Sequence, residues 1–172
     1  MFVFAYGSLI WRPGFDHLGA RPALLRGYHR RFCIWSRHYR GSPAAPGLVL
    51  GLDRGGSCHG VLFEVRPEEA ASVLEYLDAR ENLAGEIVYR RRLVRVTPAD
   101  GPPVQAITYV AERAHPAYAR PCLETATAAI AMSVGEAGSN RDYLMNTLAR
   151  LRDWGIKDHG LELIAKRINR DL

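Results

Sequence analysis

The sequence predicts an α+β fold: a small mixed β-barrel or curled sheet of at least five strands, flanked by helices. Three observations carry this prediction. Short strand-like segments at close spacing dominate the first two thirds of the 172 residues. One amphipathic helix interrupts them, and the last third carries helix formers at the spacing of buried helix faces. With 48% hydrophobic residues and no internal repeat, we expect a single domain over residues 1–172.

Turn-rich segments separate the expected strands. The strands are expected at residues 1–5, 24–36, 48–52, 59–65, 87–96 and 104–110. Loops or turns are expected at residues 11–22, 40–47, 53–57 and 97–103. Gly27 is expected to break the second strand, because a glycine inside a strand pattern often marks a bend or bulge.

The expected helices place apolar residues on one face. They are predicted at residues 67–82, 123–132 and 140–153, with a last helix near the C-terminus. Pro67 can open the first helix, and Asn140 and Asp158 are candidate N-caps of the last two. Gly155 is a plausible stop between those two. Their buried stripes are expected to contain Leu144, Leu148, Leu151, Leu161, Ile164, Ala165 and Ile168.

The composition limits the classes of function. Three cysteines without C-x-x-C spacing argue against a disulfide framework or a zinc site, so a reducing cytoplasm is expected. Cys33, between aromatic neighbours, is expected to be a buried thiol. No apolar run approaches the ~18–20 residues of a membrane span. Scattered histidines, no G-x-S-x-G elbow and no phosphate loop lead us to expect no metal and no cofactor.

The basic charge raises nucleic-acid binding as an alternative. The formal net charge is +5 and the pI is about 9.4. However, the arginines at residues 90–95 alternate with apolar residues, and those at residues 26–31 are interrupted by glycine, so neither forms a basic helix. We expect an anionic small-molecule substrate, no nucleic acid, no membrane, and a monomer or weak homodimer.

One carboxylate lies on the apolar face of the predicted helix 67–82. Val73 and Leu77 belong to a core stripe, and a further step of four residues reaches Glu81. At ~100° per residue, Glu81 therefore points inward at the end of the helix, where burial would raise its pKa. The alternative is that the helix ends earlier and Glu81 faces water or pairs with Arg80 or Arg90.

A second candidate feature follows the first strand. Tyr6, Gly7 and Ser8 place a phenol, a backbone position without a side chain and a hydroxyl within three residues. Amide N–H groups exposed in this YGS turn could bind a carboxylate or a developing oxyanion. The alternative is a plain strand that ends in a Gly-Ser turn.

Three motifs in order resemble the ChaC-type γ-glutamylcyclotransferases. They are YGSLIW at residues 6–11, YLDAREN at 76–82 and GSNRDYL at 138–144, with further matches at RRF (30–32), Ser36, RG (40–41), Pro43 and Gly47. The resemblance covers nearly the whole chain. It implies a γ-glutamylcyclotransferase-like fold and a lyase that cleaves glutathione into 5-oxoproline and cysteinylglycine.

The resemblance implies the catalytic residue, and the chemistry of the reaction suggests roles for the YGS turn. The glutamate of the family's R-E motif is catalytic, and it falls on Glu81, which we expect to act first as base and then as acid. The backbone around Gly7, Ser8 and Leu9 is expected to hold the carbonyl oxygen or the α-carboxylate of the substrate. Tyr6 is expected to hydrogen-bond the substrate or Glu81.

Tyr143 is implied to reach the same pocket, with Ser36 and Arg40 near the γ-glutamyl end of the substrate. The alternatives are a core role for Tyr143 and a loop-fastening role for Arg40. The chain departs from many relatives in its NLAGEIVY segment, where Tyr89 comes late, so the leaving group stays open. Glu86 in that segment is expected to face solvent.

Two rival functions remain open on the sequence. The same cyclisation could act on γ-glutamyl amino acids or γ-glutamylamines. Alternatively, the chain could be a non-catalytic γ-glutamyl-binding or cation-transport regulatory protein, in which Glu81 would be structural.

Overall fold

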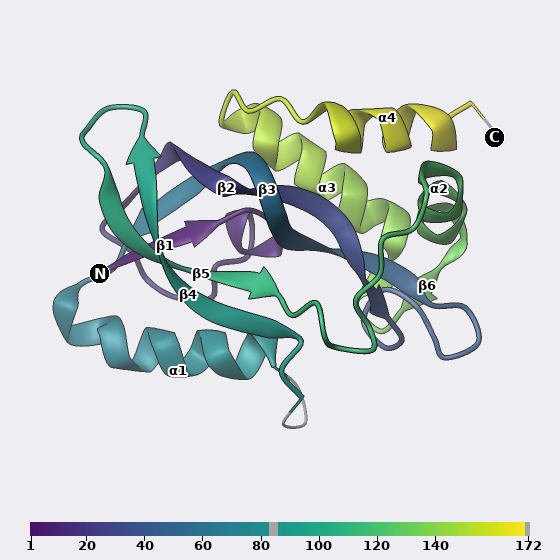
Figure 1. The fold of residues 1–172 in the computed structure, drawn as a ribbon, viewed down its shortest axis with the longest axis horizontal. Helices are drawn as coiled ribbons and strands as arrows, with labels where there is room; N and C mark the ends of the chain where they lie inside the picture. The colour runs from purple at the N-terminus through teal and green to yellow at the C-terminus, as the bar shows by residue number, and fades with distance from the viewer. Residues whose placement is uncertain (83–85, 171–172) are drawn as a thin grey trace.

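The strands of the protein close into a mixed barrel, as the computed structural model of residues 1–82 and 86–170 shows (Figure 1). Within those residues five strands follow each other around the barrel in the order β1-β3-β2-β4-β5. Their bounds are Phe2–Ala5 (β1), Gly19–Ser36 (β2), Gly47–Glu64 (β3), Tyr89–Pro98 (β4) and Val104–Ala111 (β5). Strand β1 is parallel to β5, and the other pairings are antiparallel. The predicted fold class is confirmed.

The long hairpin of β2 and β3 corrects three sequence predictions. Residues 53–57 are not a turn: β3 runs through them, with Gly55 and Gly56 at φ of 96° and 68°. These two glycines lie opposite Gly27 at a register shift, and they let β3 bulge between two stretches that pair with β2. Gly27 (φ 86°) marks a register shift and not a break, and β2 begins at Gly19, inside the expected loop 11–22.

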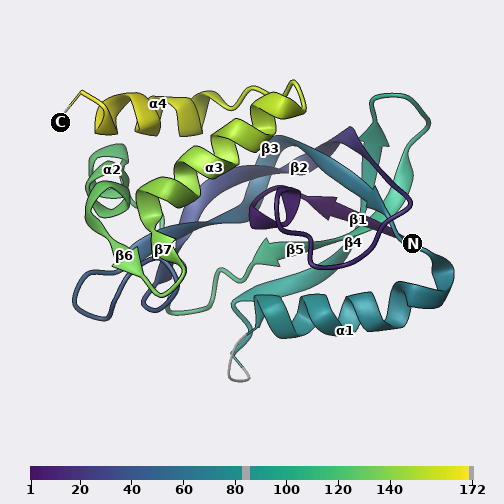
Figure 2. The same cartoon turned by 180° about the vertical axis from the view of Figure 1, so that it is seen from behind.

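Helices cover the barrel from two opposite sides (Figures 1 and 2). A 3₁₀ turn, Pro67–Glu69, leads into α1 (Ala70–Glu81) on one side. On the other side lie α2 (Leu123–Met132), α3 (Asn140–Asp153) and α4 (His159–Ile168), which agree with the predicted ranges. No sequence pattern predicts the short strands β6 (Val134–Gly135) and β7 (Gly138–Ser139) or the 3₁₀ turn Ser8–Ile10.

The sequence prediction of the α3 N-cap is wrong. Ser139, not Asn140, is the cap: its backbone is extended and its Oγ accepts a hydrogen bond from the backbone N–H of Asp142 at 3.0 Å. Asn140 is fully buried, and its side-chain amide bonds both backbone groups of Leu48, at 2.6 Å to the N–H and 2.7 Å to the carbonyl. This pairing fixes the start of α3 against β3.

The core is continuous between the barrel and the helices. The seven residues predicted to form the stripes of α3 and α4 are all buried, and the Asp158 carboxylate caps α4 by accepting from Leu161 N at 3.1 Å. The largest fully buried side chains include Tyr109, Phe4, Leu25, Leu48, Leu52, Leu62, Leu77, Ile130, Leu144 and Leu151. Among the helices of the described residues, none is long and apolar enough to cross a membrane.

Candidate active site

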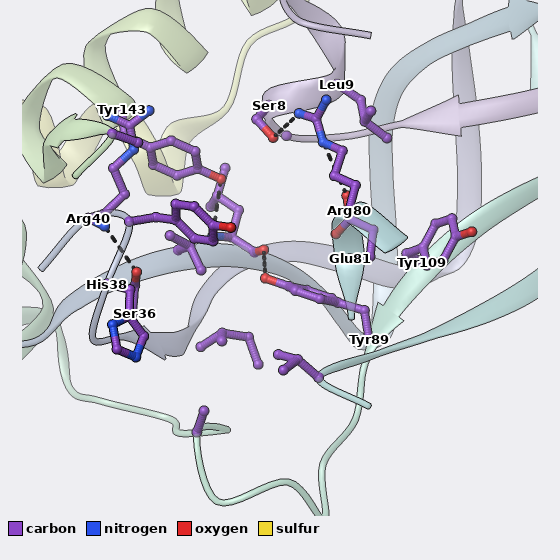
Figure 3. Close-up of a pocket in the computed structure, with 18 of the residues that line it drawn as sticks. Ser8, Leu9, Ser36, His38, Arg40, Arg80, Glu81, Tyr89, Tyr109 and Tyr143 are labelled. Atoms are coloured by element: carbon purple, nitrogen blue, oxygen red, sulfur yellow. Dashed lines mark hydrogen bonds and ion pairs between the residues drawn. The ribbon is translucent and has the colours of Figure 1, made fainter. Parts of the chain in front are cut away.

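A pocket of about 970 Å³ lies where the end of α1, the YGS turn and the start of α3 meet at the barrel (Figure 3). It is also lined by residues from β2, β3 and β4. The structure brings all eight residues singled out in the sequence to this pocket, although they come from four separate segments: Tyr6, Gly7, Ser8, Leu9, Ser36, Arg40, Glu81 and Tyr143.

Glu81 is the last residue of α1 and points into the pocket. Its side chain is only 15% exposed, as the helical periodicity predicts. Burial raises its pKa from 4.5 to about 7, although the nearby Arg80 charge opposes the shift. At neutral pH the side chain is therefore distributed between its acid and carboxylate forms, and it can both accept and donate a proton.

Arg80 lies beside Glu81 but is held mainly by other groups. Its Nε is 3.7 Å from the Glu81 carboxylate, whereas its terminal nitrogens donate to Ser8 Oγ at 3.0 Å, Tyr76 Oη at 2.8 Å and the Arg12 carbonyl at 2.7 Å. Figure 3 shows the bond from Arg80 to Ser8. The arginine thus fastens the end of α1 to the YGS turn, so that Glu81 and the turn share one pocket.

The YGS turn presents backbone amides at the pocket. Strand β1 ends at Ala5, and the 3₁₀ turn of residues 8–10 closes with Ile10 N–H donating to Gly7 O at 3.0 Å. Within residues 1–82 and 86–170, the N–H groups of Gly7, Ser8 and Leu9 have no hydrogen-bond acceptor. Such amides, clustered at a cavity, suit a carboxylate or an oxyanion.

Tyr143 faces the YGS turn from α3. Its hydroxyl accepts a hydrogen bond from Leu50 N at 3.3 Å, and it lies 3.5 Å from the position that a Cβ on Gly7 would take. A glycine at residue 7 therefore leaves the space in front of the hydroxyl open. Burial raises the pKa of Tyr143 to about 12, so that its hydroxyl stays neutral and keeps a proton to donate.

Arg40 and Ser36 lie at the same end of the pocket as Tyr143. The Arg40 guanidinium sits over the Tyr143 ring, 5.2 Å from its centroid, and donates to the Ser139 carbonyl at 3.3 Å. Burial lowers the pKa of Arg40. Ser36 Oγ accepts from the Arg40 backbone N–H at 3.0 Å, so its first role is to hold the loop that carries Arg40.

Neutral phenols surround Glu81. Burial raises the pKa values of Tyr6 and Tyr89 well above 10, and the Glu81 charge contributes to both shifts. Tyr89 Oη donates to the Leu50 carbonyl at 2.9 Å, on the opposite face of the pocket from Arg40 in Figure 3. These rings exclude water without offering a cation, which keeps the Glu81 carboxylate poorly solvated.

Sequence reasoning missed the parts played by Arg80 and Tyr89. The sequence analysis considers Arg80 only as a possible ion-pair partner of Glu81. Its position directly before the glutamate in the R-E motif could have indicated a role in the site. Tyr89 was noted for its late position; its inward orientation depends on the register of β4, which the sequence does not set. Glu86 is exposed as expected, and its carboxylate lies 3.2 Å from His115 Nε2. Of the loop between Glu81 and Tyr89, residues 83–85 lie outside the described residues.

The described residues near the pocket support neither a nucleophilic cysteine nor a metal site. Cys33 is fully buried, and burial raises the pKa of its thiol to about 12, which confirms an unreactive thiol. In the part of the chain that the structure describes, no group of three or more His, Cys, Asp or Glu side chains is placed to hold a metal ion.

Comparisons with known proteins agree with this fold. The family model described as ChaC-like protein matches residues 1–171. Human glutathione-specific γ-glutamylcyclotransferase 1 is 37% identical over 150 residues, which cover 84% of this chain and 67% of that protein. The glutathione-specific γ-glutamylcyclotransferase of Escherichia coli strain K12 is 32% identical over 162 residues, covering 94% and 69% of the two chains. A crystal structure of a yeast γ-glutamyl cyclotransferase specific to glutathione has a TM-score of 0.86 at 25% identity and covers 99% and 98%.

The closed mixed barrel, with helices on two sides and a pocket at the end of α1, is the γ-glutamylcyclotransferase fold. Within that fold, this chain belongs to the ChaC-like family.

Proposed function

We propose that this protein is a γ-glutamylcyclotransferase that converts glutathione into 5-oxoproline and cysteinylglycine, with Glu81 as the proton shuttle. The observation that carries the proposal is the setting of Glu81. A carboxyl with a pKa of about 7 faces the same pocket as the free amides of the YGS turn. The activity named for the human and Escherichia coli relatives supports glutathione as the substrate.

The reaction needs no second substrate. The α-amino nitrogen of the γ-glutamyl group attacks its own γ-carbonyl carbon, which forms the C–N bond of a five-membered ring. Because nucleophile and electrophile belong to one molecule, the pocket mainly has to select the folded conformer. The Glu81 carboxylate takes a proton from the attacking amine, while the carbonyl oxygen becomes an oxyanion.

Collapse of the oxyanion then breaks the bond between the γ-carbonyl carbon and the cysteine nitrogen. Protonated Glu81 returns its proton to this nitrogen, and cysteinylglycine leaves. One carboxyl with a pKa near the working pH suits both steps, because neither of its protonation states is scarce. General acid–base catalysis of this kind contributes about 10²–10⁴-fold in rate.

The remaining groups of the pocket match the charges of the substrate. The amides of Gly7, Ser8 and Leu9 are placed to stabilise the oxyanion or to hold the α-carboxylate. Tyr143 can donate from its neutral hydroxyl, and Arg40 beside it supplies a positive charge for an anionic end of the substrate. A net charge of +5 favours the approach of such an anion.

The proposal is tested by measuring 5-oxoproline from glutathione and from γ-glutamylalanine. We expect turnover of glutathione and much slower turnover of γ-glutamylalanine. Equal rates would replace glutathione specificity by a broader γ-glutamyl preference. Binding of glutathione without any 5-oxoproline would favour a non-catalytic binding protein.

The role of Glu81 is tested by Glu81→Gln, with Glu75→Gln as the matched control. Glutamine keeps the size of the side chain and cannot shuttle a proton, so turnover should fall by about 10² or more. Glu75 lies on the exposed face of the same helix, and its variant should keep wild-type turnover. Near-normal turnover of Glu81→Gln in a folded protein would reject the assignment.

A further inference from the structure

A buried arginine outside the pocket lining binds the backbone of the YGS turn. Arg30 belongs to β2, and its side chain is only 3% exposed. Its guanidinium donates to three acceptors on three different segments: Nε to the Tyr6 carbonyl at 2.5 Å, Nη2 to the His59 carbonyl at 2.6 Å, and Nη1 to the Asp158 carboxylate at 2.5 Å. The arginine thus joins the end of β1, strand β3 and the N-cap of α4.

The bond to the Tyr6 carbonyl sets the direction of the next amide. The peptide bond between Tyr6 and Gly7 is trans and planar, so its carbonyl and its N–H point in opposite directions. Among the described residues, Gly7 lines the pocket and Arg30 does not. Because Arg30 draws the carbonyl away from the pocket, the N–H of Gly7 is turned toward it.

We infer that Arg30 is a positioning residue, which orients and polarises the Gly7 amide as a hydrogen-bond donor to the substrate. This inference rests on the proposed function and adds to it a residue outside the pocket. A cation bonded to a carbonyl polarises the whole peptide group, so the Gly7 N–H becomes a stronger donor. The planar guanidinium suits this position because it offers several donors in a fixed fork, whereas the lysine ammonium is a single point charge.

Asp158 balances the buried charge of Arg30 and belongs to a different part of the fold. One of its oxygens accepts from Arg30, and the other caps α4 through Leu161 N. Its contribution is therefore to the stability of α4 and to the ion pair. Asparagine at this position would keep one carbonyl oxygen, and therefore one of these two bonds, and would lose the charge, which makes Asp158→Asn a control that weakens the ion pair and the α4 cap without changing Arg30 itself.

The test compares Arg30→Lys and Asp158→Asn with the wild type in turnover of glutathione and in thermal unfolding. Lysine keeps the positive charge beside Asp158, but its three N–H donors share one nitrogen and cannot reach the three acceptors that Nε, Nη1 and Nη2 of Arg30 serve. We expect Arg30→Lys to lower kcat/KM by about 10²-fold, the typical effect of losing one oxyanion donor. A fall in kcat would identify the oxyanion as the ligand of the amide, and a rise in KM would identify the α-carboxylate.

Asp158→Asn should keep kcat/KM within about threefold of the wild type, even though it lowers the melting temperature. The pH at half-maximal kcat/KM should be the same in Arg30→Lys and the wild type, because Arg30 moves no proton. Two results would overturn the inference. One is a folded Arg30→Lys variant with kcat/KM within threefold of the wild type, and the other is an equal loss of kcat/KM in the two variants.

A second measurement separates this inference from the proposed function. In protein labelled with ¹⁵N-glycine, the Gly7 amide nitrogen reports the hydrogen bond on the preceding carbonyl. Its resonance should move in Arg30→Lys and stay in place in Asp158→Asn. If the wild type forms no 5-oxoproline, the proposed function fails, and this spectrum still decides whether Arg30 sets the Gly7 amide: an unmoved Gly7 resonance in Arg30→Lys would refute it.

Discussion

Glu81→Gln is expected to make the protein more stable at alkaline pH while it lowers turnover by about 10²-fold or more. Most substitutions of partly buried side chains destabilise a protein. Here the wild-type side chain carries a cost, because the folded protein must hold a carboxylate in a site that burial makes unfavourable for charge. Glutamine fills the same space without ionising, so this cost disappears in the variant.

The pKa values give the size and the sign of the effect. A glutamate of the unfolded chain ionises with a pKa of 4.5, whereas Glu81 in the folded protein has a pKa of about 7. Between these values the folded state binds more protons than the unfolded state, so the free energy of unfolding decreases as the pH rises from 4.5 to 7. The difference between the two pKa values corresponds to about 3 kcal/mol of lost folding stability. The wild type carries this loss in full well above pH 7 and not at all below pH 4.5.

Thermal unfolding at pH 5 and pH 8 measures this difference. At pH 8, Glu81→Gln should melt roughly 6–12 °C above the wild type, since about 1 kcal/mol shifts the melting temperature of a chain of this size by roughly 2–4 °C. At pH 5 the gain should shrink to under about 1 kcal/mol. Glu75→Gln, on the exposed face of α1, should change stability by less than about 0.5 kcal/mol at either pH. A Glu81→Gln variant no more stable than the wild type at pH 8 would refute the desolvation of Glu81 and, with it, the origin of its raised pKa.

Two other substitutions probe the surroundings of the pocket. Arg80→Gln should raise the pKa of Glu81 further, because the Arg80 charge opposes the effect of burial. The acid limb of the pH profile of kcat/KM, near pH 7 in the wild type, should therefore move to higher pH. An acid limb that stays in place would contradict the coupling between Arg80 and Glu81. Asn140→Ala should lower the free energy of unfolding by about 2–4 kcal/mol, because both backbone groups of Leu48 lose a buried partner. Urea unfolding measures this loss, and Asn146→Ala on the exposed face of α3 serves as control; equal effects of the two substitutions would show that the buried pairing contributes nothing.

Local patterns were enough to predict the helices of the C-terminal third. The ranges of α2 and α3 agree with the sequence, and α4 starts after its Asp158 cap. Helical periodicity and capping depend on neighbours within a few residues, so the sequence carries them directly. The sequence prediction divides β3 in two because Gly55 and Gly56 resemble a turn. In the structure they lie at a register shift opposite Gly27, and pairing with β2 on both sides of them keeps the strand continuous.

The site shows the same division between local and long-range information. The inward orientation of Glu81 followed from the period of α1, and the YGS turn followed from three adjacent residues. The contact of Tyr143 with the turn and the support of the turn by Arg30 connect segments that are far apart in the chain. These contacts depend on barrel closure and on the register of β2, which no local pattern sets.

The sequence left open whether Glu81 is buried, faces water or pairs with an arginine, and the structure shows how burial and a nearby arginine coexist. A close ion pair with Arg80 would stabilise the carboxylate and hold the pKa of Glu81 low. Arg80 is prevented from doing so because Ser8, Tyr76 and the Arg12 carbonyl occupy its terminal nitrogens, which leaves only Nε near the carboxylate, at 3.7 Å. Burial therefore has the larger effect on the pKa of Glu81, the Arg80 charge partly opposes it, and the resulting pKa is about 7. The bond that fastens α1 to the YGS turn is thus also the one that keeps Glu81 available to take up and release a proton.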